Sequence, residues 1–314
     1  MKKIYWILII CCIACSCSDN DDSLALPATL NFNPVFNFVT DSLDIDMVNS
    51  PTSNSIYCTY SDIDLVDIYK EKVIKYNLNT SIQSSITHYD GIESRQLEVV
   101  GNEIYSLSYT GIFKYDLNLS NIVELPEFNY RIIPKTTLYN NNIIIISSTD
   151  NTFPEPSPMQ LLHFNTTSQT YSSFTTFPIG YRMRGDGVAF NDKLYIFGGN
   201  DGITNFAEIN IYDIIGNSWT QQALPFGVYE SFTSIYNNSV IVAGNRNADS
   251  SGAFIGLYNP ATNDFTSLNT SLNLNNISIR GITVINDEVY IAYAEHITPW
   301  PNNITIRIEK ASLL

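Results

Sequence analysis

The chain has 314 residues, with 20 Tyr and 16 Phe, and charged residues make up only 15% of it. Abundant aromatic and β-branched residues, together with many Asn, Ser and Thr suited to turns, predict an all-β protein large enough to bury a substantial core. The formal net charge of −15 repels phosphate backbones, which argues against nucleic acid as a partner.

The chain begins with the pattern of a secretory leader. Lys2 and Lys3 precede an apolar run from 4 to 14, which is too short to span a bilayer as a helix but fits a signal peptide. Small residues and cysteines follow in the stretch ACSCSDNDD, so we expect cleavage before Cys17, with Cys15 as the alternative. Cleavage there removes two lysines and no acidic residue, which takes the net charge from −15 to −17.

This cleavage box resembles that of bacterial lipoproteins, and the acidic stretch 19–22 resembles the surface-export signal of Bacteroidetes lipoproteins. The resemblance implies a signal peptide over 1–16 and an acidic tether over 17–28, anchored by acyl chains on Cys17. The expected location is the cell envelope, with the lipid anchor in the outer membrane and with the periplasmic and the cell-surface face as alternatives. A plain secretory signal with incidental cysteines is the alternative. Only Cys58 lies outside this segment, so neither a disulfide framework nor a cysteine-based metal site is expected.

A unit of about 45 to 50 residues, the length of a propeller blade, recurs along the chain. Each unit has a polar turn followed by an apolar strand. These segments are SNSIYCTY (53–60), GNEIYSLS (101–108), NNNIIIIS (140–147), NDKLYIFG (191–198), NNSVIVAG (237–244) and NDEVYIAY (286–293). Six units predict a six-bladed β-propeller of four-stranded antiparallel blades. One short spacing, of 39 residues, leaves seven blades as the alternative.

A second pattern predicts where the two outer strands of a blade meet. An aromatic residue in the third strand is followed seven positions later by another large residue, across a tight turn. These pairs are Tyr115/Ile122, Phe164/Tyr171, Tyr212/Trp219 and Tyr258/Phe265. In the first unit the partner of Tyr76 is Ile82, one residue earlier. We expect each pair to open and close a hairpin and to pack between neighbouring blades.

One unit carries Gly198-Gly199, Tyr212 and Trp219 in that order. This order resembles the repeat of the kelch family, within the superfamily that includes the central domain of galactose oxidase. The resemblance implies a propeller of four-stranded blades over 29–314. The other five units lack the double glycine and depend on the period and the strand pattern.

The two ends of the repeat region predict how the ring closes. The last unit stops after three strands, whereas the segment 30–38 precedes the first unit and has no blade of its own. We expect this segment to supply the outer strand of the last blade, which removes an exposed sheet edge. A tether packed loosely on the side of the propeller is the alternative.

Five of the seven arginines fall in connections between blades, which gather around one mouth of a propeller channel. The candidate rim residues are Arg95, Lys135, Arg184, Asp186, Glu230, Arg280 and Trp300. Arginine binds carboxylates through two parallel hydrogen bonds, so the rim is a candidate site for an anionic ligand such as an acidic sugar. Trp300 would offer a stacking surface, or pack on its own blade. The alternative is that the arginines neutralise neighbouring acids and bind loop carbonyls.

No catalytic constellation stands out in the sequence. The three histidines, His88, His163 and His296, lie far apart in the repeat scheme, and no cluster has metal-ligand spacing, so neither a metal nor another cofactor is expected. The copper site of the galactose oxidase family needs a tyrosine and histidine ligand set that these histidines do not supply. The first functional interpretation is therefore a non-enzymatic, membrane-anchored module that binds a carbohydrate or a protein.

Two other functions remain open. Six-bladed kelch propellers of bacteria include N-acetylneuraminate epimerases, which this chain resembles in size and architecture. That resemblance implies an enzyme acting on an acidic sugar, with Arg184, Glu230 and Arg280 as positional analogues of the residues at the channel mouth. No local motif of that family is matched, so this transfer is an analogy of fold. A subunit of a larger surface complex is the third possibility.

Overall fold

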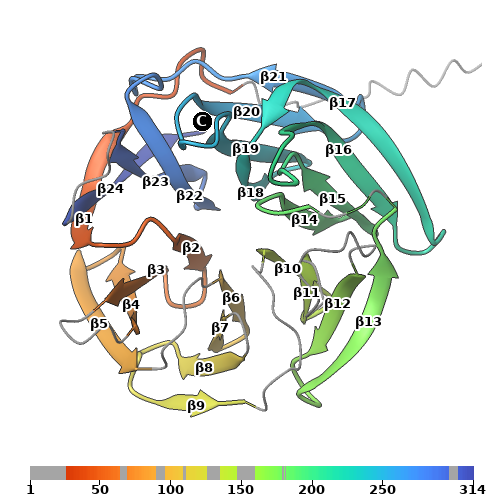
Figure 1. Ribbon diagram of the computed structural model, residues 1–314. Coiled ribbons are helices and arrows are strands. Elements are labelled where there is room, and N and C mark those ends of the chain that lie inside the picture. Colours follow the sequence, from red (N-terminus) through yellow and green to blue (C-terminus); the bar gives the residue numbers. More distant parts are fainter. Residues whose placement is uncertain are drawn as a thin grey trace, which may run out of the picture.

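The computed structural model describes residues 26–63, 69–89, 96–108, 111–125, 135–146, 160–178, 180, 182–296 and 303–314. In these ranges the regular elements are strands, β1 to β24, which form six four-stranded antiparallel sheets. Figure 1 shows the six sheets arranged as blades around a central axis. The expected fold class, a six-bladed β-propeller, is confirmed, and the seven-bladed alternative is wrong. No helix in the described ranges has the length and apolar character needed to cross a membrane.

Each blade is numbered here by the chain order of its innermost strand. Blade 1 contains β2 (Ile45–Ser50), β3 (Ser55–Ile63), β4 (Tyr69–Asn77) and β5 (Ile82–Tyr89). Blade 2 contains β6 (Gln96–Val100), β7 (Glu103–Leu107), β8 (Ile112–Asp116) and β9 (Ile122–Glu124). Blade 3 contains β10 (Lys135–Tyr139), β11 (Asn142–Ile146), β12 (Gln160–Asn165) and β13 (Thr170–Thr176).

The second half of the ring repeats this order until the last blade. Blade 4 contains β14 (Asp186–Phe190), β15 (Lys193–Phe197), β16 (Phe206–Asp213) and β17 (Ser218–Val228). Blade 5 contains β18 (Glu230–Tyr236), β19 (Ser239–Asn245), β20 (Ala253–Asn259) and β21 (Asp264–Ser267). Blade 6 contains β22 (Ile277–Ile285), β23 (Glu288–Glu295), β24 (Ile304–Ser312) and, as its outer strand, β1 (Asn33–Thr40).

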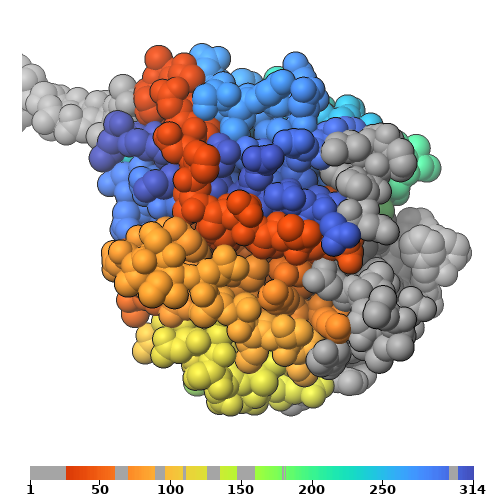
Figure 2. All heavy atoms as spheres, turned by 90° about the vertical axis from the view of Figure 1, so that its left-hand side faces the viewer, coloured from red at the N-terminus to blue at the C-terminus, as the bar shows by residue number. Residues whose placement is uncertain are grey.

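Strand β1 closes the ring, because it pairs antiparallel with β24 and joins the two ends of the chain in one sheet. It overlaps the segment 30–38 that the sequence singled out for this place. Figure 2 shows the N-terminal segment, in red, lying between the blue last blade and the orange first blade. Phe38 is 7% exposed, and its ring stacks on Tyr60 of blade 1 with 5.0 Å between centroids. Closure therefore removes a sheet edge and buries apolar surface against blade 1.

The hairpin pattern of the sequence is confirmed in the strand register. The four predicted pairs are direct Cα partners across their hairpins: Tyr115 and Ile122, Phe164 and Tyr171, Tyr212 and Trp219, Tyr258 and Phe265. In blade 1 the predicted partner of Tyr76, Ile82, is wrong: Tyr76 faces Gln83, seven positions later as in the other hairpins, and Ile82 faces Asn77. Tyr212 also belongs to a buried cluster with Ile144 and Ile146 of blade 3. The pairs therefore fix the outer hairpins and pack one blade on the next.

The double glycine of blade 4 has a steric cause. Gly198 and Gly199 have φ values of +54° and +89°, where residues with a Cβ are strained. A Cβ on Gly198 would lie 2.4 Å from the Cβ of Val228, and one on Gly199 would lie 2.6 Å from the carbonyl oxygen of Met183. Only glycine fits at either position, so the kelch signature marks a close approach of three chain segments.

Hydrogen bonds from backbone to side chain join neighbouring inner strands around the axis. The inner edge of each blade carries amide groups that no further strand can pair. Side chains of the preceding blade accept from these amides: Leu97 donates to Asp46 (2.6 Å), Ala189 to Thr137 (3.2 Å), Thr233 to Asp186 (2.7 Å) and Val284 to Ser234 (3.1 Å). Asn49 of blade 1 donates to the carbonyl of Val284 in blade 6 (2.9 Å). Polar residues on the inner strands are therefore part of the framework.

We predict that Phe38→Ala lowers the free energy of unfolding by about 3–5 kcal/mol, because it leaves a cavity where β1 meets blade 1. Val39, the next residue in the strand, is 50% exposed and offers a matched control. Val39→Ala keeps the β1–β24 ladder and should change stability by less than about 1 kcal/mol. Denaturant unfolding measures both variants. Equal losses would contradict a closing role for the buried face of β1.

Candidate ligand-binding site

The six inner strands all begin at one end of the central channel, here called the mouth, since every blade repeats the same strand order. Arg95 and Trp300, as well as Cys15 and Cys17, lie outside the described residues. The other candidate rim residues lie at or near the start of an inner strand: Lys135, Asp186 and Glu230 begin β10, β14 and β18, Arg184 lies two residues before β14, and Arg280 is the fourth residue of β22. The structure therefore brings together residues from four consecutive blades, 3 to 6.

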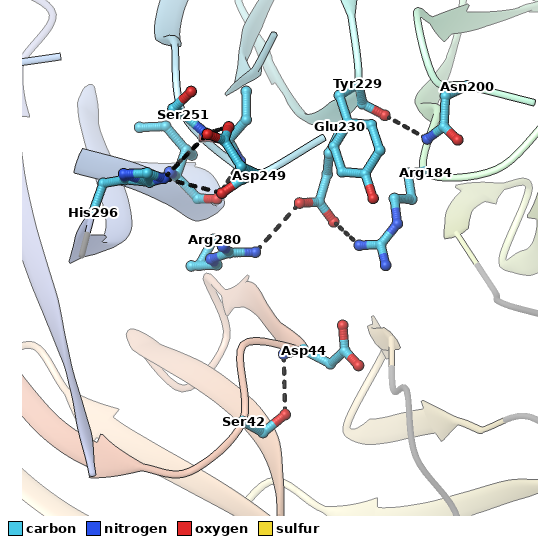
Figure 3. Close-up of polar contacts among 12 residues, drawn as sticks. Ser42, Asp44, Arg184, Asn200, Tyr229, Glu230, Asp249, Ser251, Arg280 and His296 are labelled. Atoms are coloured by element: carbon cyan, nitrogen blue, oxygen red, sulfur yellow. Dashed lines mark hydrogen bonds and ion pairs between the residues drawn. The ribbon is translucent and has the colours of Figure 1, made fainter. Parts of the chain in front are cut away.

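Glu230 lies between two arginines at the mouth. Arg184 Nη1 is 3.3 Å from Glu230 Oε1, and Arg280 Nη1 is 3.4 Å from Oε2, so the two guanidinium groups approach different oxygens (Figure 3). The side chains of Glu230 and Arg280 are 8% and 3% exposed, whereas that of Arg184 is 29% exposed. Burial alone would raise the pKa of Glu230, but the charges of Arg280, Lys135 and Arg184 outweigh it and hold that pKa below its usual value.

Two further groups complete this site, and neither was a candidate in the sequence analysis. The guanidinium of Arg184 lies 5.3 Å from the ring centroid of Tyr229, within range of a cation–π contact. Asp44, from the segment before β2, lies across the mouth, and its charge acts on both Arg184 and Arg280 (Figure 3). Asn200 donates to the carbonyl of Tyr229 (3.1 Å) and ties the blade 4 loop to this wall.

The backbone holds Arg184 in an uncommon conformation. Its φ is +60°, a region that few residues with a long side chain occupy. The amide of Ser231 donates to the Arg184 carbonyl (3.1 Å), which links the turn to blade 5. The next residue, Gly185, has no room for a side chain, because a Cβ there would lie 2.9 Å from the carbonyl oxygen of Gly198. Such local strain is typical of residues that a fold holds in place for function.

Arg280 reaches the mouth because of a β-bulge. The register of β22 and β23 shifts between Ile279 and Gly281, so Arg280 is the extra residue without a direct partner in the ladder. Asn245, at the end of β19, clamps the residue before it: its side-chain amide donates to the Ile279 carbonyl and accepts from the Ile279 amide, both at 2.9 Å. Asn245 is also the direct ladder partner of Glu230. One buried amide therefore positions both partners of the Glu230–Arg280 ion pair.

Two arginines near the mouth have structural partners instead. Arg182 is 3% exposed, donates to the carbonyl of Gly198 (2.7 Å) and pairs with Glu208, while its guanidinium lies 4.2 Å from the ring centroid of Phe206. The guanidinium of Arg246 lies 3.7 Å from the ring centroid of Phe226. Arg182 therefore has the structural role that the sequence analysis gave as the alternative to ligand binding: it neutralises a neighbouring acid and donates to a loop carbonyl.

Asp186 and Lys135 are the first residues of their inner strands, and both are buried. Asp186 Oδ2 accepts from both the amide and the hydroxyl of Thr233 (2.7 and 2.8 Å), and burial raises the pKa of Asp186 to about 6. The ammonium of Lys135 lies 4.1 Å from the ring centroid of Phe232, and the side chain is 5% exposed. The Lys135 charge acts on Asp46, Asp186 and Glu230, so it connects the mouth with the channel below.

The three histidines lie in different blades. His88 packs on the ring of Phe113, and His163 on that of Phe174. His296 follows β23 at the mouth, where its Nε2 donates to the backbone carbonyl of Asp249 (3.0 Å; Figure 3). The part of the chain that the structure describes has no group of three or more His, Cys, Asp and Glu side chains that would hold a metal ion.

We predict that Asn245→Ala lowers the free energy of unfolding by about 2–4 kcal/mol, because it leaves the buried amide and carbonyl of Ile279 without partners. Asn247, two residues further on, bonds only the exposed hydroxyl of Ser251 (2.9 Å). Asn247→Ala should therefore stay within about 0.5 kcal/mol of the parent. Chemical denaturation compares the two, and an Asn245→Ala loss no larger than the control would contradict the clamp.

Comparisons with known proteins agree with this architecture. A family model of the kelch motif matches residues 186–223, the repeat with the double glycine. The structure is similar to that of YjhT, with a TM-score of 0.61 and 12% identity over 90% of this chain and 96% of that one. It is also similar to a copper-bound fungal alcohol oxidase of the AA5 family, with a TM-score of 0.63 and 11% identity over 90% of this chain and 76% of that one. No curated protein matches the sequence significantly. The motif match and the two structural likenesses together support a kelch β-propeller.

Proposed function

We propose that the protein is a membrane-anchored binding module that takes a carboxylate-bearing ligand, such as an acidic sugar, at the mouth. One observation carries this proposal: Arg184 is held in a strained backbone conformation, its side chain is 29% exposed, and its one ion pair among the described residues is the 3.3 Å contact with Glu230. A guanidinium presents five N–H donors, and this contact engages one nitrogen. A ligand carboxylate would find the remaining donors facing the mouth.

The surroundings of Arg184 fit such a ligand. At the described part of the mouth, Arg184, Arg280 and Lys135 lie beside the carboxylates of Glu230, Asp44 and Asp186, in a chain whose net charge is −15. These cations offset the neighbouring acids, so an anion meets less repulsion at the mouth than the charge of the whole chain would suggest. The half-buried ring of Tyr229, beside Arg184, offers an apolar face to the non-ionic part of the ligand.

We predict that the purified protein binds an acidic sugar from a panel of N-acetylneuraminate, glucuronate and glucose, with glucose as the neutral control. Arg184→Ala should weaken binding by a factor of roughly 10–150, since hydrogen bonds to charged groups contribute about 1.5–3 kcal/mol. Arg307 bonds Glu295 on the outer part of blade 6, so Arg307→Ala is the matched control. Titration calorimetry gives the affinities. Binding unaffected by Arg184→Ala, or absence of binding to any carboxylate, would contradict the proposal.

An enzyme acting on an acidic sugar is the second candidate. The observation that favours it is the contact of Arg184 and Arg280 with Glu230, the three residues that the sequence marked as positional analogues of epimerase residues. A buried carboxylate between two guanidinium groups is suited to orienting a substrate carboxylate nearby. Incubation with N-acetylneuraminate, followed by NMR, separates the two functions: conversion indicates an enzyme, and binding without conversion indicates a binding module.

We also propose that an acyl anchor on Cys17 holds the propeller at the outer membrane. The apolar run and the cysteines of the leader support this, and acyl chains anchor a soluble domain without a spanning segment. Cys17→Ala should move the protein from the membrane fraction to the soluble fraction after cell lysis, whereas Cys15→Ala, the matched control, should leave it in the membrane fraction. The reverse result would assign the anchor to Cys15, and retention of both variants would argue against lipidation.

A further inference from the structure

The channel contains an open cavity of about 360 Å³. The inner strands of all six blades line it, and most of its polar lining consists of short side chains with hydroxyl, amide or carboxyl groups. These are Asp46, Asn49, Gln96, Glu98, Thr136, Thr137, Asp186, Thr233, Ser234 and Thr283. A cavity of this volume is at the lower end of the range for small-molecule sites and suits one part of a ligand.

A buried cation lies at the top of this cavity. Lys135 is 5% exposed, and its ammonium lies 4.1 Å from the ring centroid of Phe232, which lines the cavity. Its charge acts on the carboxylates of Asp46 and Asp186, which also line the cavity, and on Glu230 at the mouth. A hydrogen-bond acceptor stabilises an ammonium group that is largely removed from bulk water. A ligand in the neighbouring cavity can supply such an acceptor.

Hydrogen bonds hold Asp46 and Asp186 in place, and burial raises the pKa values of Asp46, Glu98 and Asp186. Asp46 and Asp186 each use Oδ2 to accept a backbone amide of the next blade. Burial raises the pKa of Glu98 to about 8 and that of Asp186 to about 6. At neutral pH a protonated Glu98 both donates and accepts hydrogen bonds. The walls therefore offer hydrogen-bond donors and acceptors side by side.

We infer that this cavity is a subsite for a neutral, hydroxyl-bearing part of the ligand whose carboxylate lies on Arg184. This inference rests on the proposed function of the mouth. A hydroxyl group can accept a hydrogen bond from Lys135 and donate one to Asp46 or Asp186. A chain of hydroxyl groups can therefore bind to both the cation and the carboxylates of the cavity. An apolar group would leave these charges without partners, an anion would face the two aspartates, and a cation would face Lys135.

Three probes of similar length separate the two subsites in the purified protein. Gluconate has a carboxylate and a hydroxyl chain, hexanoate has only the carboxylate, and sorbitol has only the hydroxyl chain. We expect gluconate to bind at least about tenfold more tightly than hexanoate, because a site built for hydroxyls discriminates against analogues that lack them. Lys135→Met should remove this advantage while hexanoate binding stays within about twofold.

The controls keep the test decisive. Lys193, an exposed lysine of β15, supplies the matched variant Lys193→Met, which should change none of the affinities. Thr136→Val removes a hydroxyl of the cavity without a change of charge and serves if Lys135→Met does not fold. Equal affinities of gluconate and hexanoate would overturn the channel subsite and leave the mouth intact. Gluconate and sorbitol binding that depends on Lys135 but not on Arg184 would retain the channel and overturn the mouth. No binding of any probe would overturn both.

Discussion

The pairing of β1 with β24 is the constraint on which the mouth depends. This ladder joins the two ends of the chain and fixes the distance between blades 1 and 6. Asp44 lies in the short segment between β1 and β2, whereas Arg280 lies in blade 6, so their approach across the mouth follows directly from closure. Gly281, next to Arg280, lets the blades come close, since a Cβ there would lie 3.0 Å from the Cβ of Met47. Closure thus stabilises the fold and assembles the site in the same step.

Close packing around the axis also explains why the channel is polar. Six inner strands converge with their amide edges toward one another, and these edges cannot all be paired by backbone. Asp46, Thr137, Asp186 and Ser234 accept amides of the following blade, so polar side chains are required there for stability. Their remaining hydrogen-bonding capacity faces the cavity. A channel that can hold hydroxyl groups is therefore a consequence of how the ring is held together.

The sequence predicts the repeated parts of this molecule well, because each depends on residues close together in the chain. The spacing between Tyr212 and Trp219 is enough to predict their hairpin register. Local spacing does not predict the β-bulge at Arg280, because the residue that holds it, Asn245, lies in another blade. The contact of His296 with Asp249 is not predictable from local spacing either, since 47 positions separate these residues in the sequence. The sequence predicts the arginines near the mouth as a group. That Arg182 has a structural role follows only from its contacts with Gly198 and Glu208, which the structure shows.

The two arginines of the mouth have different freedom, and this difference indicates how a ligand would enter. Arg280 is 3% exposed and clamped through Ile279, so its position is fixed before any ligand arrives. Arg184 is 29% exposed, and its contact with Glu230 at 3.3 Å is longer than a strong charge-assisted hydrogen bond. A ligand carboxylate that offers Arg184 two short, parallel bonds would compete well with this single contact. Glu230 would keep Arg280 as its partner, so no buried charge would be stranded when Arg184 turns toward the ligand.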